Sequence, residues 1–398
     1  MTCWRRVRRL REGHKAKLMR VTMLNKYYPP HLGGIEFHVR DLAEGLVERE
    51  GAKVSALVAN DGPGSVREML GGVEVMRMSR FAQYASTPIA LGMRQQLRFL
   101  LSGPEASDVL HLHFPYPWGE ISWLSMNARV PAVMTYHSDI VRQKTSLALY
   151  KPLLEKVLDR VDLIIASSPN MVEHSEFLAP RAEKCRVVPF GLHVERFAAT
   201  QELLERAARL KARHSHRKVV LFVGRLVYYK GVDVLLRAMS DVDADLVIIG
   251  KGPLESELRE QAHSQGIASR VFFEPPVSDE DLTAWYHASD VFCLPSVARS
   301  EAFGLVQVEA HASGLPVVST DLTTGVPFVN ADGVTGLVVP PGDSSALARA
   351  LGTLLSDDDL RRRLGEQARS RANAEFSIER MVTQTVSVYR EAIEGQRR

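Results

Sequence analysis

Apolar residues along the chain gather in two alternating kinds of run. Short runs rich in valine, leucine and isoleucine, typical of buried strands, are separated by longer stretches with the apolar period of a helix. In the first half the pattern predicts strands at residues 20–24, 54–58, 109–113, 132–135, 163–166 and 186–188, with helices at 35–48 and 149–158. Strands that alternate with helices indicate a parallel sheet covered by helices on both faces.

The same pattern restarts after residue 217. It predicts strands at 219–223, 246–249, 271–273, 291–294, 316–319 and 336–339, and then helices at 344–355, 358–375 and 378–396. The charged stretch between the two sets, residues 201–217, contains neither glycine nor proline, which favours a helix followed by a linker. At 398 residues the chain is also longer than a single hydrophobic core usually allows.

We therefore predict an α/β protein of two doubly wound, Rossmann-like domains. The predicted parts are a basic N-terminal extension at 1–18, an N-terminal domain at 19–205, a C-terminal domain at 216–375 and a last helix at 376–398. In such sheets a ligand binds at the carboxyl ends of the strands, where the strand order reverses. The residues that follow each strand are thus the first candidates for function.

The composition is that of an ordinary soluble protein. Hydrophobic residues make up 45% and charged residues 24%, and no apolar run approaches the ~18 residues that span a bilayer. The three cysteines, Cys3, Cys185 and Cys293, are too scattered for a disulfide framework or a metal site. This cysteine usage favours a reducing, cytoplasmic compartment.

The net charge is only +3, but the first twenty residues are strongly basic. They contain one acid, Glu12, against Arg5, Arg6, Arg8, Arg9, Arg11, Lys15, Lys17 and Arg20. The stretch lacks the apolar segment of a secretion signal. It favours either electrostatic attachment to an anionic membrane or nucleic acid, or a disordered extension upstream of Met19, and we predict the disordered extension.

Two basic residues follow the first predicted strand of the C-terminal domain. Gly224-Arg225 comes directly after that strand, and Lys230-Gly231 follows five residues further on. An arginine can bind two phosphate oxygens at once, and a lysine adds a point charge. A solvated basic pair in a loop is the alternative, but the position at the carboxyl end of a strand favours a diphosphate site.

Two glutamates lie eight residues apart after the strand predicted at 291–294. Glu301 is expected in a loop, and Glu309 two turns into a helix that begins near Phe303. A capping acid and a surface acid would be the ordinary explanation. It fits Glu309 poorly, because this residue is embedded in an apolar run and a buried acid needs partners. We therefore predict that both carboxylates bind hydroxyl groups of a ligand.

Three further motifs lie where predicted strands end. Gly33-Gly34 opens a helix and predicts either an anion site at the helix N-terminus or a tight turn that needs positive φ. His137 would contact a sugar or move a proton there, and a satisfied loop histidine is the alternative. Gly250-Lys251 fits either a ligand contact or a tight turn.

No metal site is predicted. His111 and His113 end a strand with metal-like spacing but have no third ligand nearby in sequence, so packing is the better interpretation. The acidic run at 241–245 precedes a strand and would lie at the amino edge of the sheet, so we interpret it as a solvated turn. The acids at 357–359 are interpreted as a helix start.

Taken together, these motifs resemble those of the retaining glycosyltransferases of family 4, which have the GT-B fold. The resemblance extends from Met19 to the last helix. It rests on the order and spacing of Gly33-Gly34, residues 109–113, His137, residues 188–191, Gly224-Arg225 with Lys230-Gly231, residues 250–253, and Glu301 with Glu309. It implies two Rossmann-like domains that face a cleft, with a last helix that crosses back to the first domain. The C-terminal domain would hold a nucleotide-sugar donor, and the N-terminal domain would hold most of the acceptor.

The resemblance also implies roles for residues. Arg225 and Lys230 would bind the diphosphate. Glu301 would bind sugar hydroxyls, Glu309 the ribose, and His137 would line the sugar near its anomeric carbon. The catalytic residues implied are His137, Glu301, Arg225 and Lys230; the donor-binding residues implied are Gly33, Gly34, Arg225, Lys230, Gly250, Lys251, Glu301, Phe303, Gly304, Leu305 and Glu309. No metal and no other cofactor is expected.

The chain departs from the family pattern at two places. His193 stands where relatives often carry an aspartate, and residues 324–330 lack a glutamate that is common there. The second stretch, with residues 332–336, is similar to bacterial transferases that build mannose- or rhamnose-containing surface polysaccharides. The resemblance thus implies hexosyl transfer, with GDP-mannose as the expected donor and a lipid-linked or polysaccharide acceptor.

The expected location is cytoplasmic. The basic extension and a short basic amphipathic stretch at 92–101 favour peripheral association with the inner face of the cytoplasmic membrane, although an ordinary surface helix explains that stretch equally well. No nucleic-acid partner is expected. The alternatives that stay open are a GT-B sugar-nucleotide epimerase or phosphorylase, the latter without a motif for pyridoxal phosphate, and a non-catalytic sugar-nucleotide-binding partner.

Overall fold

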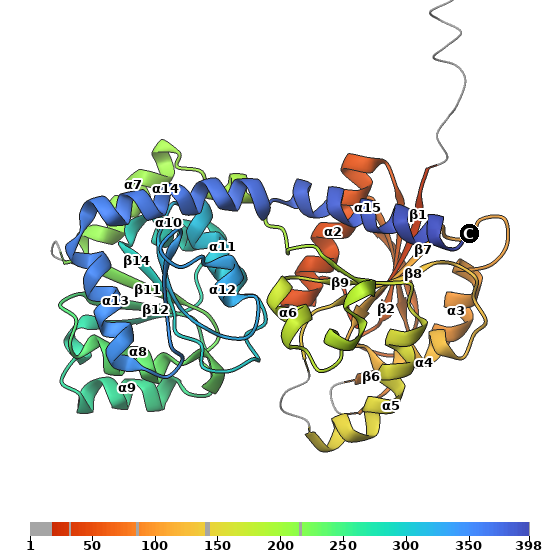
Figure 1. The fold of residues 1–398 in the computed structure, drawn as a ribbon, viewed down its shortest axis with the longest axis horizontal. Helices are drawn as coiled ribbons and strands as arrows, with labels where there is room; N and C mark the ends of the chain where they lie inside the picture. The colour runs from red at the N-terminus through yellow and green to blue at the C-terminus, as the bar shows by residue number, and fades with distance from the viewer. Residues whose placement is uncertain (1–17, 32, 85–86, 140–143, 215–216, 398) are drawn as a thin grey trace, which may run out of the picture. The chain divides into compact units, whose positions relative to one another are not determined.

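The computed structural model describes residues 18–31, 33–84, 87–139, 144–214 and 217–397 (Figure 1). Apart from Leu18, the predicted basic extension lies outside the described residues. The chain divides into two compact units, one of Met1–Val133 with Ala392–Arg398 and one of Met134–Glu391. The division falls within strand β8 (Ala132–Tyr136), so this strand contributes to both units.

The first sheet has eight strands in the order β10-β9-β8-β7-β1-β2-β4-β3. The bounds of the other seven are β1 Arg20–Leu24, β2 Lys53–Ala59, β3 Val66–Leu70, β4 Val73–Met78, β7 Val109–Phe114, β9 Leu163–Ala166 and β10 Cys185–Val187. β1 pairs in parallel with β2 and β7, whereas β3 is antiparallel to β4. The six strands predicted in this half are confirmed. The structure adds β3, β4 and a separate hairpin of β5 (Arg80–Tyr84) and β6 (Thr87–Ala90).

The second sheet has six strands in the order β13-β12-β11-β14-β15-β16, and all its pairings are parallel. The strands are β11 Val219–Val223, β12 Asp245–Ile249, β13 Val271–Glu274, β14 Val291–Leu294, β15 Val317–Thr320 and β16 Gly336–Val339. The chain runs outward from β11 through β12 to β13 and then returns to the other side of β11 as β14. The order therefore reverses between β11 and β14, which is where such sheets bind ligands.

The helices predicted at 35–48, 149–158, 344–355, 358–375 and 378–396 are confirmed in position, and the structure adds further helices between the strands. Their bounds are α2 Gly34–Glu50, α3 Met93–Leu100, α4 Pro117–Leu124, α5 Lys144–Arg160, α6 Pro169–His174, α7 Gln201–Ala212, α8 Val232–Met239, α9 Glu255–Ser264, α10 Asp279–Ala288, α11 Leu305–Ala312, α12 Val326–Val329, α13 Ser344–Ser356, α14 Asp358–Glu375 and α15 Ile378–Gly395. The predicted helix start near Asp357 is confirmed, since its side chain accepts a hydrogen bond from the amide of Leu360 at 2.8 Å.

The second sheet is buried on both faces. Val220 and Phe222 of β11 pack with residues of α8, α9 and α13. Their neighbours Val219 and Leu221 pack in a separate cluster with residues of α10 and α11. Because successive side chains of a strand point to opposite faces, an uninterrupted apolar strand such as β11 needs a layer of helices on each side.

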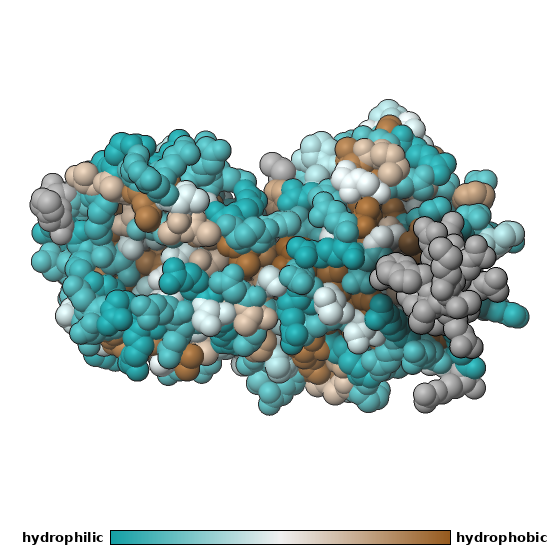
Figure 2. Space-filling view, turned by 90° about the horizontal axis from the view of Figure 1, so that it is seen from above, coloured by the Kyte–Doolittle hydropathy of each residue, from teal (hydrophilic) through white to brown (hydrophobic). Residues whose placement is uncertain are grey.

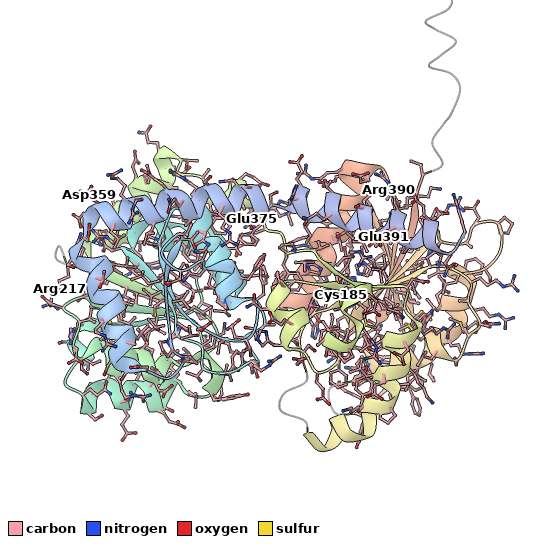
Figure 3. The ribbon with its side chains drawn as sticks, in the orientation of Figure 1. Cys185, Arg217, Asp359, Glu375, Arg390 and Glu391 are labelled. Carbon is pink, nitrogen blue, oxygen red and sulfur yellow. The ribbon has the colours of Figure 1, made fainter. Side chains whose placement is uncertain are left out.

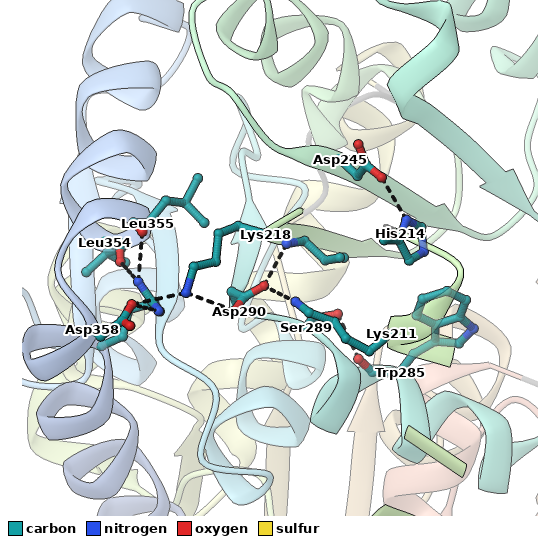
Figure 4. Close-up of polar contacts among 12 residues, drawn as sticks. Lys211, His214, Lys218, Asp245, Trp285, Ser289, Asp290, Leu354, Leu355 and Asp358 are labelled. Atoms are coloured by element: carbon teal, nitrogen blue, oxygen red, sulfur yellow. Dashed lines mark hydrogen bonds and ion pairs between the residues drawn. The ribbon is translucent and has the colours of Figure 1, made fainter. Parts of the chain in front are cut away.

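Polar contacts tie the amino edge of the second sheet to the surrounding helices (Figure 4). Asp245, the first residue of β12, is buried, and its Oδ2 lies 2.9 Å from Nδ1 of His214. Asp290 accepts a hydrogen bond from the amide of Val219 at 2.7 Å and pairs with Lys211. The interpretation of residues 241–245 as a solvated turn is thus wrong for Asp245, which is a structural partner of His214.

The last helix returns to the first sheet, as predicted. Nε of Arg186, on β10, donates to Oε2 of Glu391 on α15 at 2.9 Å. Figure 3 labels Glu391 and Cys185, the residue that precedes Arg186. From Ala392 onward the chain belongs to the first unit. In Figure 2 hydrophilic residues cover most of the face shown, and apolar residues appear between them in separate groups. No helix in the described part of the chain is both long and apolar enough to cross a bilayer.

Candidate functional site

A buried ion pair stands at the point where the second sheet reverses its strand order. Lys230 follows β11 and Glu301 follows β14, and Nζ of Lys230 lies 2.6 Å from Oε2 of Glu301. The two side chains are 10% and 9% exposed. Ser296, just after β14, donates from its hydroxyl to the same carboxylate oxygen at 3.1 Å. The sequence singled out both charged residues, and the structure brings them together across β11 and β14.

Arg225 lies on the same edge of the sheet, but unlike Lys230 it is not part of a buried ion pair. Its side chain is exposed, and among the described residues it makes no side-chain hydrogen bond or ion pair. Gly224 before it has a φ of 153°, a conformation that side chains rarely tolerate. A solvated guanidinium beside a buried lysine fits a ligand that carries more than one negative charge.

Gly250 and Gly252, which follow β12, allow their loop to pack directly against the backbone that follows β11. A Cβ at Gly250 would lie 2.0 Å from the carbonyl oxygen of Gly224, and one at Gly252 would lie 2.1 Å from that of Leu226. The amide of Leu226 donates to the carbonyl of Lys251 at 2.9 Å. The sequence left a ligand contact and a tight turn open for Gly250. The close approach of the two backbones supports a structural role for this glycine. The side chain of Lys251 is exposed on the same loop.

The helix after β14 begins two residues later than predicted. Gly304 is the N-cap of α11, with a φ of 75°, and Leu305 is the first helical residue. Phe303 therefore precedes the helix and is buried. The amide of Gln307 donates to the carbonyl of Gly304 at 2.8 Å. The two helical amides before it, those of Leu305 and Val306, have no acceptor within the helix and are available to an anionic group.

Glu309 is the fifth residue of α11, one turn into the helix rather than two. It is partly buried, and the hydroxyl of Tyr286 on α10 donates to its Oε2 at 2.6 Å. Burial raises the pKa of Glu309 to about 7, against the opposing effect of the Tyr286 hydrogen bond and of the nearby Arg196 and Lys230. Nothing in the local sequence indicates Tyr286, which lies 23 residues away on another helix.

His137 follows β8 and belongs to an aromatic row in the second unit. Its ring centroid lies 5.4 Å from that of Phe190, which lies 5.1 Å from that of Phe303. Phe190, Phe303 and Phe376 form a small apolar cluster with Val308 and Val329. The row links the end of β8 to the start of α11, and Phe190 is a member that the residue pattern identified only as part of the segment 188–191.

Gly33 and Gly34 belong to the first unit, at the N-terminus of α2. Neither glycine has a positive φ. The pair therefore does not form the tight turn that was one of the two predictions. A Cβ at Gly33 would lie 2.2 Å from Oε2 of Glu36, whereas a Cβ at Gly34 would meet nothing within 4 Å. The carboxylate of Glu36 thus folds over the first of the two glycines and leaves open space beside the second.

Among the described residues that follow β11, β12 and β14, no three histidine, cysteine or acidic side chains lie close enough together to hold one ion. His111, on β7 of the other sheet, is fully buried, and burial lowers its pKa to about 3. It is therefore neutral at physiological pH.

Comparisons with known proteins show the family to which this chain belongs. Residues 33–191 match the model of the glycosyl transferase 4-like domain, and residues 206–371 match that of glycosyl transferases group 1. The O-antigen chain mannosyltransferase C of Escherichia coli is 35% identical over 382 residues, which cover 95% of this chain and 100% of the relative. This chain belongs to the family 4 glycosyltransferases.

Other relatives agree with this assignment. The D-rhamnosyltransferase WbpZ of Pseudomonas aeruginosa is 36% identical over 362 residues, with 90% of this chain and 92% of the relative covered. Among solved structures, a sucrose-phosphate synthase of Thermosynechococcus elongatus superposes with a TM-score of 0.75 at 24% identity, covering 95% of this glycosyltransferase and 100% of that chain. The HepE protein of Anabaena, solved with UDP, gives a TM-score of 0.77 at 20% identity, covering 94% and 100%. These structures show that the glycosyltransferase has the GT-B fold.

Proposed function

We propose that this glycosyltransferase moves a mannosyl group from GDP-mannose to a lipid-linked or polysaccharide acceptor in the synthesis of a bacterial surface glycan. The observation that carries the proposal is the buried pair of Lys230 and Glu301 at the strand-order reversal, with the exposed guanidinium of Arg225 beside it. A nucleotide sugar combines a diphosphate with a polyol, and this edge offers cations for the first and a carboxylate for the second.

The charges suit the bond that has to break. As the anomeric C–O bond opens, negative charge grows on the diphosphate and positive charge on the sugar. Arg225 and Lys230 would stabilise the departing diphosphate in the manner of an oxyanion site. Lys230 would then share its charge between the diphosphate and Glu301, and the carboxylate would accept hydrogen bonds from sugar hydroxyls.

We propose that the transfer retains the anomeric configuration and needs no metal ion. In this account the leaving phosphate takes the proton of the acceptor hydroxyl on the same face of the sugar, so no protein nucleophile takes part. His137 would line the sugar, held by its contact with Phe190. Positive charge from two side chains and from the amides at the start of α11 would take the place of a divalent cation.

The choice of donor rests on the relatives. One is a mannosyltransferase and another a D-rhamnosyltransferase, at 35% and 36% identity. D-Rhamnose is mannose without the hydroxyl at carbon 6, so the two donors differ by a single hydroxyl group. A site that binds this hydroxyl through a hydrogen bond rejects the deoxy sugar strongly, whereas an apolar pocket separates the two sugars weakly. Mannose is our first candidate and D-rhamnose the second.

The acceptor would be met at a membrane. We propose a cytoplasmic protein that associates peripherally with the inner face of the cytoplasmic membrane, where a lipid-linked glycan is accessible. The N-terminal domain would hold this acceptor, and the C-terminal domain, proposed to span residues 216–375, would hold the donor.

The test is transfer from GDP-mannose carrying a radiolabelled sugar, in the presence of a membrane fraction that contains lipid-linked glycans. The proposal predicts label in the glycan, release by an α-mannosidase and no loss of rate in EDTA. Consumption of the donor without any acceptor would favour the epimerase instead. Tight donor binding without turnover, unchanged in His137→Ala, would favour the non-catalytic partner.

A further inference from the structure

An ion pair joins the two loops that carry His137 and Glu301. Nη2 of Arg299 donates to Oδ2 of Asp139 at 2.7 Å. Asp139 stands two residues after His137, and Arg299 stands two residues before Glu301. Both partners of the pair belong to the second unit. They are 160 residues apart in the sequence, so only the folding of the chain brings them together.

The carboxylate of Asp139 is oriented by its own neighbours. Its other oxygen, Oδ1, accepts a hydrogen bond from the hydroxyl of Tyr136 at 3.0 Å and one from the hydroxyl of Ser175 at 2.7 Å. Tyr136 is the last residue of β8 and Ser175 follows α6, and both are buried. Because two buried hydroxyls hold one oxygen, the second oxygen offers Arg299 an acceptor in a fixed direction.

The guanidinium of Arg299 binds two further groups. Nη2 also donates to the carbonyl of His174 at 2.9 Å, and Nη1 donates to the hydroxyl of Thr323 at 2.8 Å. His174 is the last residue of α6, and the carbonyls at a helix end favour a cation. Thr323 lies in the loop after β15. A planar group with several donors can hold all three acceptors at once, which a lysine cannot.

The loop of Glu301 is attached to the second sheet by other contacts. Glu301 pairs with Lys230, which follows β11. The amide of Gly325, in the loop after β15, donates to the carbonyl of Ala302 at 2.7 Å. The contacts of Arg299 add a link from the same loop to the end of β8 and to α6.

We propose that Asp139 and Arg299 are positioning residues for the transfer, and that their ion pair sets the place of Glu301 relative to His137. Both act through the loops that they join and not by contact with the sugar. Because a misplacement of about 1 Å can lower a rate about a hundredfold, an ion pair outside the site can control turnover in this way. The inference rests on the proposed function in one respect, since it takes His137 and Glu301 to act on the same donor sugar.

The experiment is a double-mutant cycle of Asp139→Asn, Arg299→Gln and the double variant in the full chain. Rates are measured with the sugar nucleotide that the wild type consumes, and GDP-mannose is the first probe. Each single variant should lower kcat at least about tenfold and change the Kd for GDP less than about threefold. The double variant should be no slower than the single variants, because each substitution breaks the same link. Arg299→Lys keeps a cation beside Asp139 and should recover part of the rate.

The stability of the variants distinguishes positioning from a merely structural role. The side chains of Arg299 and Asp139 are 34% and 20% exposed, so loss of the pair should change the Tm little. The matched control is Arg206→Gln, which breaks an ion pair with Glu280 at 3.2 Å by a side chain that is 37% exposed, and it should keep the wild-type kcat. An unchanged kcat in both single variants, or losses that multiply in the double variant, would overturn the proposal. A fall in kcat that matches a smaller folded fraction would do the same.

Amide hydrogen exchange without any ligand separates this inference from the proposed function. Amides near His137 should exchange faster in Arg299→Gln, and amides near Glu301 should exchange faster in Asp139→Asn, whereas Arg206→Gln should change neither region. Faster exchange in both variants, together with a wild type that consumes no sugar nucleotide, would reject the proposed function and support the link between the loops. Unchanged exchange in both regions would overturn the inference even where the wild type transfers mannose.

Discussion

Nζ of Lys230 lies 2.6 Å from Oε2 of Glu301, and each side chain is about nine-tenths buried. In the donor-free protein the lysine charge is therefore already compensated inside the C-terminal half. A donor diphosphate would have to compete with Glu301 for Lys230, and its sugar would gain a carboxylate that the lysine has held in position. In the proposed site, the pair would hold the lysine and the carboxylate in position before a nucleotide sugar binds.

Removing one member of this pair should cost stability as well as activity. Lys230→Met leaves a buried carboxylate without its cation, a change that typically costs about 3–5 kcal/mol. Glu301→Gln leaves the lysine uncompensated in the same way. Each single variant should unfold at a lower denaturant concentration than the wild type, and turnover should fall by more than about a hundredfold.

The double variant Lys230→Met/Glu301→Gln separates the two effects. It buries no unpaired charge, so most of the lost stability should return while turnover stays as low as in the single variants. A double variant that regains activity together with stability would show that the pair is structural only. The measurements are denaturant unfolding and initial rates at saturating donor.

Glu309 should make stability depend on pH around neutrality. Its pKa is raised by burial from 4.5 to about 7, so the folded protein holds this proton more tightly than the unfolded chain does. The stabilising contribution of the protonated form is present at low pH and is lost as pH rises from about 4.5 through 7. Unfolding free energies measured between pH 5 and 8 should therefore fall more steeply for the wild type than for Glu309→Gln.

Donor binding should show the opposite trend at the same residue. If the ionised carboxylate accepts hydrogen bonds from the ribose, the affinity for GDP should rise as pH increases through about 7. Glu309→Gln should bind more weakly above pH 7 and lose this step in the profile. A wild-type profile that is flat between pH 6 and 8 would remove Glu309 from the ribose site.

Gly250 should not tolerate a side chain. A Cβ would lie 2.0 Å from the carbonyl oxygen of Gly224, at a φ of 145° that disfavours other residues. Gly250→Ala should therefore destabilise the protein by about 2 kcal/mol or more and displace the loop that carries Arg225. Gly352→Ala is the control, because this glycine lies in α13 with no atom near its Cβ position, and alanine there should be neutral or stabilising by about 0.5–1 kcal/mol.

His137 should affect turnover more than donor binding. His137 follows β8, its ring packs against Phe190, and it is not among the residues predicted to bind the diphosphate. His137→Asn should lower kcat by at least about tenfold and change the Kd for GDP less than threefold. Loss of GDP binding in this variant would instead indicate that His137 holds the loops of the site together.

Much of this architecture could be predicted from the chain because its central strands are continuous apolar runs. β11 and β14 were predicted with their observed bounds, and they place Lys230 and Glu301 at one edge. β3 and β5 were missed since both are edge strands with mostly exposed side chains, so their pattern is not that of a buried strand. Predicting the antiparallel pair of β3 with β4, and the hairpin of β5 with β6, therefore requires knowledge of the tertiary structure.

The residues that contact these buried acids could not be predicted from local sequence patterns, for a different reason. Tyr286 reaches Glu309 from another helix, and His214 buries Asp245 from 31 residues away, so neither contact leaves a periodic signal. The start of α11 shifted because Gly304 adopts positive φ and acts as its N-cap. Charge and position at strand ends were enough to predict the candidate site, but the burial of its groups follows only from packing.

The most direct test of the donor site is isothermal titration of GDP and GDP-mannose into the wild type and Arg225→Ala without added metal. Arg225 is the cleanest probe because its side chain is exposed and unpaired among the described residues, so its loss should leave the Tm unchanged. The account predicts binding of both ligands by the wild type and at least a tenfold rise in Kd for the variant. Equal affinities in the two proteins, or no binding of any nucleotide by the wild type, would contradict the assignment of this edge as the nucleotide-sugar site.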